Sequence, residues 1–456
     1  MTRQQFTNYL TYFILFLLPW QARFIVATPT LQGGEWEYGV MGLYLIEVLI
    51  LLAVALRGRP EWIDGSWRVR KATTLFLGGI FFSVAFSLYF HLSLFTLLHI
   101  MMALFLFGLL VDRRVCTKKI VGSFLAGLVL PSALAWWQVV TGGSGASTLL
   151  GLSAQNAEVL GTSVIEVGGE RILRGYGSFS HPNIFGGYLA VGLLFFSWLS
   201  FKHEHMALKS LKFAVLQKIK EQPIIKPLLE KWGSYSLQLV AMGAGIAIFA
   251  STLVITFSRS AWLGLVAGIC VVGFFHILFK RKIHKKALRF GAIGFAALLI
   301  TLLIFSGPVL SRFNPEVPLE ARSIEERIGG YAWVDDIVSI NVFTGVGAGG
   351  YTAALSIVDP GHESYLYQPV HNTFALMFSE LGMIGFAFFI IWFVSIDLTN
   401  YRTVKKLGGM FGMGLGLTIL VLALFDHYPW SNWSGLALMA VSFGLMLRWG
   451  LEAKKT

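Results

Sequence analysis

The sequence predicts an all-α polytopic membrane protein, and two observations carry this prediction. Hydrophobic residues make up 55% of the 456 residues and charged residues only 13%, whereas soluble domains carry roughly 25% charged residues. Apolar stretches of about 20 residues, the length that crosses a bilayer as a helix, recur from one end of the chain to the other. One water-soluble core does not bury so many apolar segments, so we expect a single integral membrane domain over residues 1–456.

The apolar stretches predict about twelve transmembrane helices. No internal repeat and no linker rich in Gly, Ser or Pro divides the chain. The expected spans are 9–27, 38–56, 72–90, 91–111, 119–140, 183–201, 236–257, 260–280, 290–310, 372–396, 409–427 and 432–448.

Lysine and arginine predict the orientation of these spans. With both termini in the cytoplasm, 29 of the 36 Lys and Arg residues fall on the inner side, as the positive-inside rule requires. The largest inner segment is the basic cytoplasmic loop 202–235. The seven remaining residues are Arg23, Arg171, Arg174, Arg259, Arg312, Arg322 and Arg327.

The net charge of +12 is therefore mainly a topology signal, and the loop 202–235 is also suited to contact anionic membrane lipids. Nucleic-acid binding is a poor interpretation, because the basic residues are spread over several loops without a binding motif. Cys116 and Cys270 form no outward disulfide framework. Solvated loop acids explain the pairs at 335–336 and 362–363 better than a metal site does, and we expect neither metal nor cofactor.

Outward-facing polar sequence is concentrated in two long segments, 141–182 and the large loop 311–371 before the tenth helix. Four polar clusters meet this face of the membrane. They read RGYGSFSHPNIFGG (174–187), FSRSAW (257–262), EERIGGYAW (325–333) and VHNTFALMFSELGMIG (370–385).

Arginines in these clusters have both a functional and a structural interpretation. Arg259 lies at a span end, where it either anchors the interface or serves the function expected of ionisable groups at the membrane edge. Arg171 and Arg174 are either ordinary loop residues or ligands of an anion, and Arg174 is favoured because it adjoins the Gly-rich cluster. Arg23, near the outer end of the first span, is a weaker candidate.

Two His/Asn pairs open two spans on the same face. His181 and Asn183 flank a proline and are suited to cap a helix start, which is the structural alternative to a catalytic role for His181. His371 and Asn372 repeat the arrangement at the tenth span. Glu380 follows nine residues inside, about 13 Å deeper at 1.5 Å per residue, where we expect it to support the histidine or an arginine.

This combination of groups suits one kind of chemistry. Guanidinium groups bind phosphate oxygens through paired hydrogen bonds. A histidine takes a proton from a hydroxyl near neutral pH. Together they favour attack by an acceptor hydroxyl on a phosphate-activated substrate, which outside the cytoplasm we expect to be lipid-linked.

The four clusters, in this order and on one side of the membrane, resemble the O-antigen ligase and polymerase superfamily of bacterial membrane glycan ligases. The resemblance implies a C-type-glycosyltransferase-like fold in the bacterial cytoplasmic (inner) membrane with the active site on the outer side. It implies metal-independent, inverting transfer of a glycan from an undecaprenyl-diphosphate-linked donor to an acceptor hydroxyl.

The same resemblance implies roles for individual residues. His371 matches the proposed base, and Arg259 and Arg327 match arginines implicated in diphosphate binding. Arg174 matches a further arginine of the superfamily, while Asn183 and Asn372 shape the site.

The acceptor is open to several alternatives: a lipid A core sugar for a ligase, another lipid-linked glycan for a polymerase, or a protein hydroxyl for an O-oligosaccharyltransferase. A transporter of lipid-linked glycans or small anions is a further alternative. That alternative predicts inverted repeats, broken helices and polar residues through the midplane.

Overall fold

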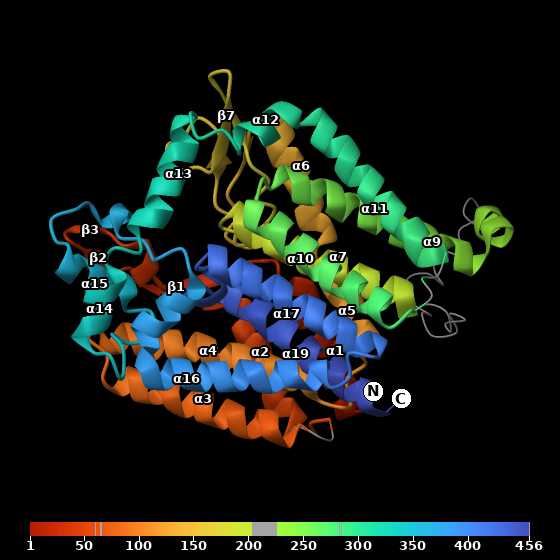
Figure 1. Cartoon of the computed structure of the whole chain (residues 1–456), viewed down its shortest axis with the longest axis horizontal. Helices are drawn as coiled ribbons and strands as arrows, with labels where there is room; N and C mark the ends of the chain where they lie inside the picture. The colour runs from red at the N-terminus through yellow and green to blue at the C-terminus, as the bar shows by residue number, and fades with distance from the viewer. Residues whose placement is uncertain (60, 64–65, 203–225, 282, 284, 456) are drawn as a thin grey trace.

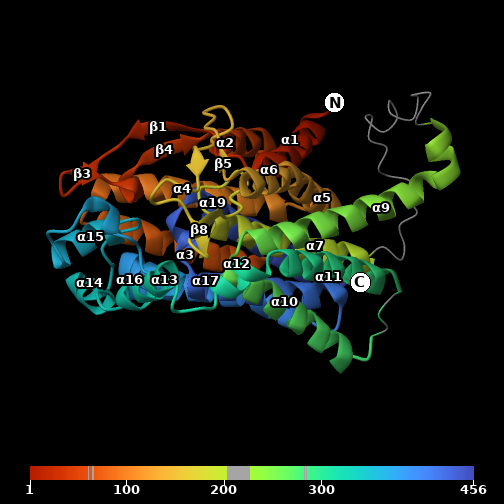
Figure 2. The ribbon, with the colours of Figure 1, turned by 90° about the horizontal axis from the view of Figure 1, so that it is seen from above.

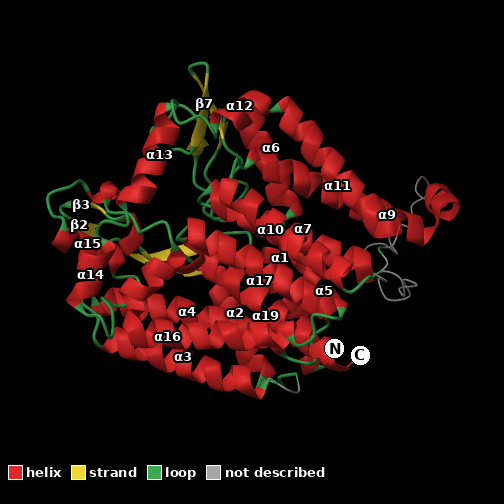
Figure 3. Cartoon of the chain, in the orientation of Figure 1, coloured by secondary structure: helices red, strands yellow, loops and turns green. Residues whose placement is uncertain are grey.

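Helices that lie side by side dominate the computed structural model, which describes residues 1–59, 61–63, 66–202, 226–281, 283 and 285–455 (Figures 1 and 3). The strands form four separate two-stranded antiparallel sheets. The predicted all-α membrane fold is confirmed. The long helices are α1 (Arg3–Leu17), α2 (Leu45–Arg57), α3 (Trp67–Ala85), α4 (Phe90–Val111), α5 (Thr117–Gly127), α6 (Val129–Thr141), α7 (Pro182–Lys202), α9 (Lys226–Ile255), α10 (Arg259–Leu278), α11 (Lys285–Ile304), α16 (Thr373–Tyr401), α17 (Leu407–Phe425) and α19 (Trp433–Lys455).

Shorter elements connect these helices. The short helices are η1 (Glu37–Gly39), α12 (Ser306–Ser311), α13 (Pro318–Gly329), α14 (Val334–Ile340), α15 (Tyr351–Val358), η3 (Ser364–Leu366) and α18 (Tyr428–Ser431). The strands are β1 (Arg23–Ala27), β2 (Thr30–Leu31), β3 (Gly34–Glu35), β4 (Met41–Tyr44), β5 (Gly143–Ser144), β6 (Gln155–Asn156), β7 (Val164–Val167) and β8 (Glu170–Leu173).

Within the described ranges, eight segments are long and apolar enough to cross a membrane. They correspond to eight of the twelve predicted spans, so the count of twelve stays a prediction. The segments are Phe90–Val111, Thr117–Thr141, Pro182–Lys202, Arg259–Leu278, Lys285–Ile304, Thr373–Tyr401, Leu407–Phe425 and Trp433–Lys454.

The first two predicted spans, 9–27 and 38–56, are wrong as continuous helices. α1 has 15 residues and α2 has 13, shorter than the roughly 20 that a full crossing needs. The hairpin of β1 and β4 takes up the rest of both segments, with Arg23 opposite Tyr44. β-branched Ile25 and Val26 favour extended backbone, which explains why the apolar run leaves the helix here.

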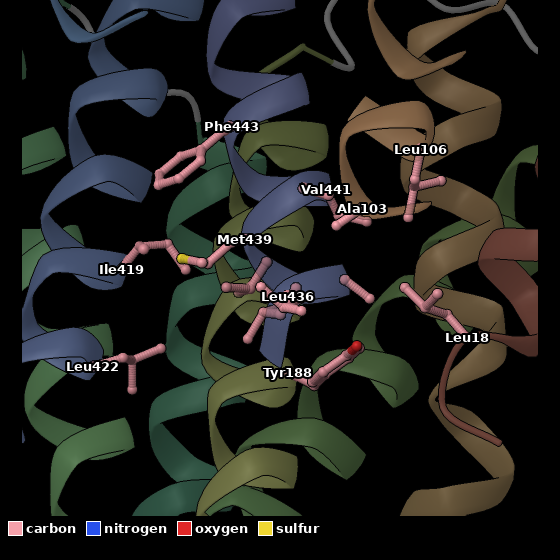
Figure 4. Packing of buried hydrophobic residues seen from close by; sticks show 14 of the residues in the cluster. Leu18, Ala103, Leu106, Tyr188, Ile419, Leu422, Leu436, Met439, Val441 and Phe443 are labelled. Atoms are coloured by element: carbon pink, nitrogen blue, oxygen red, sulfur yellow. The ribbon is translucent and has the colours of Figure 1, made fainter. Parts of the chain in front are cut away.

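α19 and α7 form the centre of the bundle. The membrane-spanning window of α19 is 100% buried and that of α7 is 83% buried, whereas that of α11 is 17% buried. α19 packs along α17 and α4, while α10 packs along α17 and α3 along α16. Leu436, Met439 and Phe443 of α19 lie among the side chains of these neighbours (Figure 4).

The two outer segments predicted from the sequence contain most of the short elements. Residues 141–182 hold β5 to β8, and residues 311–371 hold α13, α14 and α15. The basic loop 202–235 lies largely outside the described residues. Both termini lie at one end of the bundle, opposite the end that carries α13, α14 and α15 (Figures 1 and 2).

α16 is interrupted at Gly382, whose φ is 63°. Residues 342–347 run beside the interruption and occupy its backbone groups: the N–H of Val346 donates to Ser379 (3.0 Å), and the N–H of Met383 donates to Val342 (2.8 Å). Irregular backbone at membrane depth is tolerated where protein buries it in this way. The glycines of GVGAGG are required there, because a Cβ on Gly347 would lie 2.0 Å from Ser87 Oγ.

Candidate functional site

A cavity of about 430 Å³ lies where α7, α10 and α16 begin, where α17 ends and where α13 passes over them. Polar groups and apolar groups share its wall. The lining residues are Asn183, Arg259, Ser260, Leu263, Arg312, Ile324, Arg327, Ile328, Tyr331, His371, Leu424 and Phe425.

Two arginines beside this cavity donate hydrogen bonds to carbonyl groups at the end of α9. The last carbonyls of a helix have no partner within it and attract cations and other donors. Arg174 Nε donates to the carbonyl of Thr256 at 2.9 Å, and Arg312 Nε donates to the carbonyl of Phe257 at 3.2 Å. Phe257 has a φ of 49°, a left-handed conformation that is strained for a bulky residue. The FSRSAW turn is therefore held in its conformation by residues from both outer segments.

Glu320 of α13 pairs with two of the cavity arginines. Its carboxylate is buried, accepts a hydrogen bond from Arg312 and lies 3.3 Å from Arg259 Nη2. Arg259 Nη1 also donates to the carbonyl of Arg312 at 2.6 Å. One carboxylate thus holds Arg259 and Arg312 together at the wall of the cavity.

Arg327, like Arg259 at Nη2, leaves a buried nitrogen without a hydrogen bond among the described residues. It lies on α13 and lines the cavity, and its buried Nε has no hydrogen-bond partner among the described residues. The lining includes Arg259, Arg312 and Arg327, and the Glu320 carboxylate that pairs with the first two lies behind it, so cationic groups outnumber anionic ones. This arrangement suits an anionic ligand with several oxygen atoms.

A chain of hydrogen bonds links the RGYGSFSHPN segment to the opposite wall. Arg174 Nη2 donates to Asn183 Oδ1 at 2.7 Å, and Asn183 Nδ2 donates to Asp426 Oδ2 at 2.8 Å. All three residues are buried. Asn183 lines the cavity and Arg174 stands behind it, so the structure gives Arg174 a positioning role, while direct contact with a diphosphate stays a prediction.

His181 is bonded to the protein through both ring nitrogens. Nδ1 accepts from the N–H of Asn183 at 3.1 Å, which caps the start of α7, and Nε2 lies 3.1 Å from Ser163 Oγ. Burial lowers the pKa of His181 to about 3, with the charge of Arg174 acting in the same direction. These contacts favour the structural alternative for His181.

The two glycines after this segment are required by close packing. A Cβ on Gly186 would lie 2.9 Å from Ser258 Cβ, and a Cβ on Gly187 would lie 2.1 Å from Tyr428 Oη. The start of α7 therefore lies directly against both the FSRSAW turn and the turn after α17.

His371 lines the cavity just before α16. Asn372 caps that helix by accepting from the N–H groups of Phe374 and Ala375 at 2.9 and 3.1 Å. Burial lowers the pKa of His371, Asp426 raises it and Arg327 lowers it further, so the net shift is downward. The imidazole is neutral near pH 7.

Asp426 and His427 follow α17 and contact two residues that line the cavity, Asn183 and His371. The rings of His371 and His427 meet edge to face with centroids 5.1 Å apart. Burial alone would raise the pKa of Asp426, but His427, His371 and His181 lower it overall, so the carboxylate is ionised. Neither residue belongs to the four polar clusters that the sequence analysis names.

Glu380 bonds directly to neither a histidine nor an arginine in its described contacts, so any support that it gives to the site is indirect. Its carboxylate accepts from the N–H of Gly349 at 2.8 Å and from Trp430 Nε1 at 2.7 Å, with a longer contact to the N–H of Tyr351 at 3.4 Å. It instead fixes the GVGAGG turn to the turn after α17.

Arg23 and Arg171 lie outside the cavity lining. Arg23 Nη1 donates to Tyr44 Oη at 3.4 Å in the β1–β4 hairpin. Arg171 Nε donates to the carbonyl of Ala157 at 2.7 Å in the loop before β7. Of the two neighbouring arginines, Arg174 is therefore the one that approaches the site. In the described part of the chain, no group of three or more His, Cys, Asp or Glu side chains is placed to hold a metal ion.

Comparison with known protein families identifies the segment that carries most of this site. Residues 244–390 match the O-antigen ligase family model. Over this segment the match supports the resemblance to the O-antigen ligase superfamily that the sequence predicts. No curated protein matches the chain.

The O-antigen ligase match covers the arginine side of the cavity and the start of α16. It includes Arg259, Arg312, Glu320, Arg327 and His371. The remaining part of the wall comes from outside the matched segment, since Asn183 precedes it and Leu424 and Phe425 follow it.

Four residues of the site were not predicted from the sequence: Arg312, Glu320, Asp426 and His427. Arg312 was one of only seven outward arginines, which was a usable signal. No sequence signal pointed to Glu320, because a carboxylate in a loop indicates a functional site only when its arginine partners are known.

Proposed function

We propose that the protein transfers a glycan from an undecaprenyl-diphosphate-linked donor to an acceptor hydroxyl at the outer face of the bacterial cytoplasmic membrane. One observation carries the proposal. Arg327, with an unbonded buried Nε, and His371, a histidine that is neutral near pH 7, line the same cavity. An anion-binding group and a base therefore face one space.

The diphosphate is assigned to the arginine side of the cavity. Arg327 supplies an open donor, and Arg259 and Arg312 supply positive charge that Glu320 neutralises only in part. Guanidinium groups bind phosphate oxygens in pairs, and they stabilise the negative charge that develops when a diphosphate leaves.

The proton is assigned to His371. The acceptor O–H bond breaks as its proton moves to an imidazole nitrogen, and the oxygen forms a bond to the anomeric carbon of the donor sugar. The bond from that carbon to the phosphate oxygen breaks, and its electron pair leaves with undecaprenyl diphosphate. Attack from the face opposite the leaving group inverts the anomeric configuration.

The lipid chain is assigned to the apolar part of the same wall. Leu263 is 48% exposed, Leu424 46% and Phe425 48%, and these side chains lie at the ends of two candidate membrane spans. A polyprenyl chain in the bilayer is thus able to bring its diphosphate to Arg259 without leaving the membrane.

The transporter alternative finds support in one feature, the interruption of α16 at Gly382. Broken helices in transporters leave backbone groups free for the substrate, however. Here the 342–347 segment occupies backbone groups on both sides of the interruption. Glycan transfer is therefore the function that the site supports best.

The test is to incubate the purified protein in detergent with an undecaprenyl-diphosphate glycan and candidate acceptors, with and without EDTA. A general base contributes roughly 10²–10⁴-fold, so His371→Ala should lose transfer by about that factor while it still binds donor. His362→Ala is the matched control, because His362 is an exposed outer-loop histidine. EDTA should leave turnover unchanged.

Normal transfer by His371→Ala would remove the assigned base. Donor that crosses a liposome bilayer without reacting would favour transport. Inhibition by EDTA that a divalent ion reverses would contradict the metal-independent reaction.

A further inference from the structure

We infer that His427 is the positioning residue of His371, and that its ring holds the His371 imidazole at the cavity wall and shields one side of it from water. The inference rests on the proposed function, because it assumes that His371 is the base. It assigns a role to a histidine outside the O-antigen ligase match at 244–390.

The contact between the two rings is the first observation. Their centroids lie 5.1 Å apart with the ring planes at 77°. This edge-to-face geometry is a preferred one for packed aromatic rings. A side chain so packed has fewer rotamers available, and it approaches its ligand already oriented.

The anchoring of His427 is the second observation. The ring Nδ1 of His427 lies 2.7 Å from Ser431 Oγ. The backbone N–H of His427 donates to Asp426 Oδ1 at 2.9 Å. Tyr38 makes another edge-to-face contact with the same ring, at 5.9 Å. The ring is therefore fixed by its own turn and by the segment between β3 and β4.

The turn itself is held to the two helices that carry the site. Thr373 Oγ1, two residues after His371, donates to the carbonyl of Asp426 at 2.8 Å. Asn183 Nδ2 donates to the Asp426 carboxylate, and Trp430 Nε1 donates to Glu380. The distance between the histidines is thus set by bonds to α7 and α16, and packing alone does not have to maintain it.

Charge and burial around the pair give the contact a consequence for proton transfer. The charged and titratable groups that act on His371 are Asp426, Arg327 and Glu326, and those that act on His427 are Asp426 and His371. Tyr38 packs against the His427 ring, and His181 is influenced by both imidazoles. Burial is the largest influence on both imidazoles and keeps both neutral at neutral pH; the pKa of His427 falls to about 4. Removal of the His427 ring would admit water and weaken this influence on His371.

The experiment titrates His371 directly and separately measures transfer. The protein is labelled with [15N]histidine in detergent, and the His371 imidazole resonance is identified by its loss in His371→Gln. The variants are His427→Ala, which removes the ring, and His427→Phe, which keeps a ring but loses the bond to Ser431. His362→Ala is the control.

In His427→Ala, the pKa of His371 should rise toward 6.5 and transfer at pH 7.5 should fall by up to about 100-fold, the effect of a misplaced catalytic group. His427→Phe should keep the lowered pKa, because the ring still excludes water, and should still lose rate. The His362→Ala control should match the wild type in both measurements.

Unchanged titration of His371 in His427→Ala would overturn the inference, whatever happens to the rate. A shifted titration together with normal transfer by His371→Ala would instead overturn the proposed function. The two failures are therefore distinguishable.

Discussion

Arg448 and Arg327, two arginines at opposite ends of the bundle, differ in how many of their donors the protein uses. At the end near the termini, all three guanidinium nitrogens of buried Arg448 are bonded: to Thr117 and Glu452 and to the carbonyls of Leu110, Asp112 and Val115. At the cavity, Arg327 has a buried Nε without a partner among the described residues.

The number of bonded guanidinium donors separates the structural arginine from the functional one in this protein. Burial alone does not separate them, because Arg448 is more buried than Arg327. A buried donor left unbonded is destabilising unless a ligand completes it. Saturated bonding therefore indicates a structural role, and an open donor beside a cavity indicates a ligand.

The largest effects are expected when each of the two arginines is replaced by alanine and both stability and donor binding are measured. Arg448→Ala should lower the free energy of unfolding by about 3–5 kcal/mol, because it leaves buried acceptors unbonded. Arg327→Ala should leave stability unchanged and lose donor binding. Thermal unfolding in detergent and binding of a diphosphate lipid measure the two effects. Equal losses of stability in both variants would contradict the comparison.

A second prediction tests whether the guanidinium group of Arg259 is needed at the cavity. Arg259→Lys keeps the charge but loses the planar fork that reaches both Glu320 and the Arg312 carbonyl, so transfer should fall by about tenfold or more. Arg322→Lys is the control, because Arg322 is exposed and, within the described part of the chain, forms its ion pair with Glu326 one helical turn away. If both variants transfer normally, Arg259 is merely an interfacial anchor.

The third prediction concerns pH. Because the pKa of His371 is lowered, the base is deprotonated at neutral pH and becomes protonated only below the ordinary histidine value of about 6.5. The transfer rate should therefore be level through neutral pH and fall on the acid side of 6.5. A rate that already falls between pH 8 and 7 would contradict a buried, neutral base.

The smallest perturbation tests which end faces outward. Single cysteines are introduced at Ser180 and Gly361, near the cavity end, and at Lys405, near the termini, after Cys116 and Cys270 are replaced by serine. An impermeant thiol reagent should label the first two in intact cells and not the third. Labelling at Lys405 alone would invert the topology and move the site to the cytoplasm.

Sequence alone determined the membrane class, the positions of most long helices and the segments that meet at the cavity. Apolar runs of about 20 residues have few folding alternatives in a bilayer, because the backbone must satisfy its own hydrogen bonds. The same reasoning located the clusters around Arg259 and His371, since polar residues at span ends are uncommon enough to be noticed. The prediction of continuous helices failed for 9–27 and 38–56, because part of each apolar segment forms a strand of the β1–β4 pair.

The partners of the polar residues became known from the packing of the helices and not from the sequence. Glu320 bridges Arg259 and Arg312, Glu380 holds the GVGAGG turn, and Asp426 reaches Asn183 across 243 positions of sequence. Each bond depends on the packing of helices that are distant in the chain, and hydropathy specifies the depth of a residue but not its neighbour. The unbonded Nε of Arg327 is likewise a property of the folded protein, because the positions of all neighbouring acceptors must be known before a donor can be called unbonded.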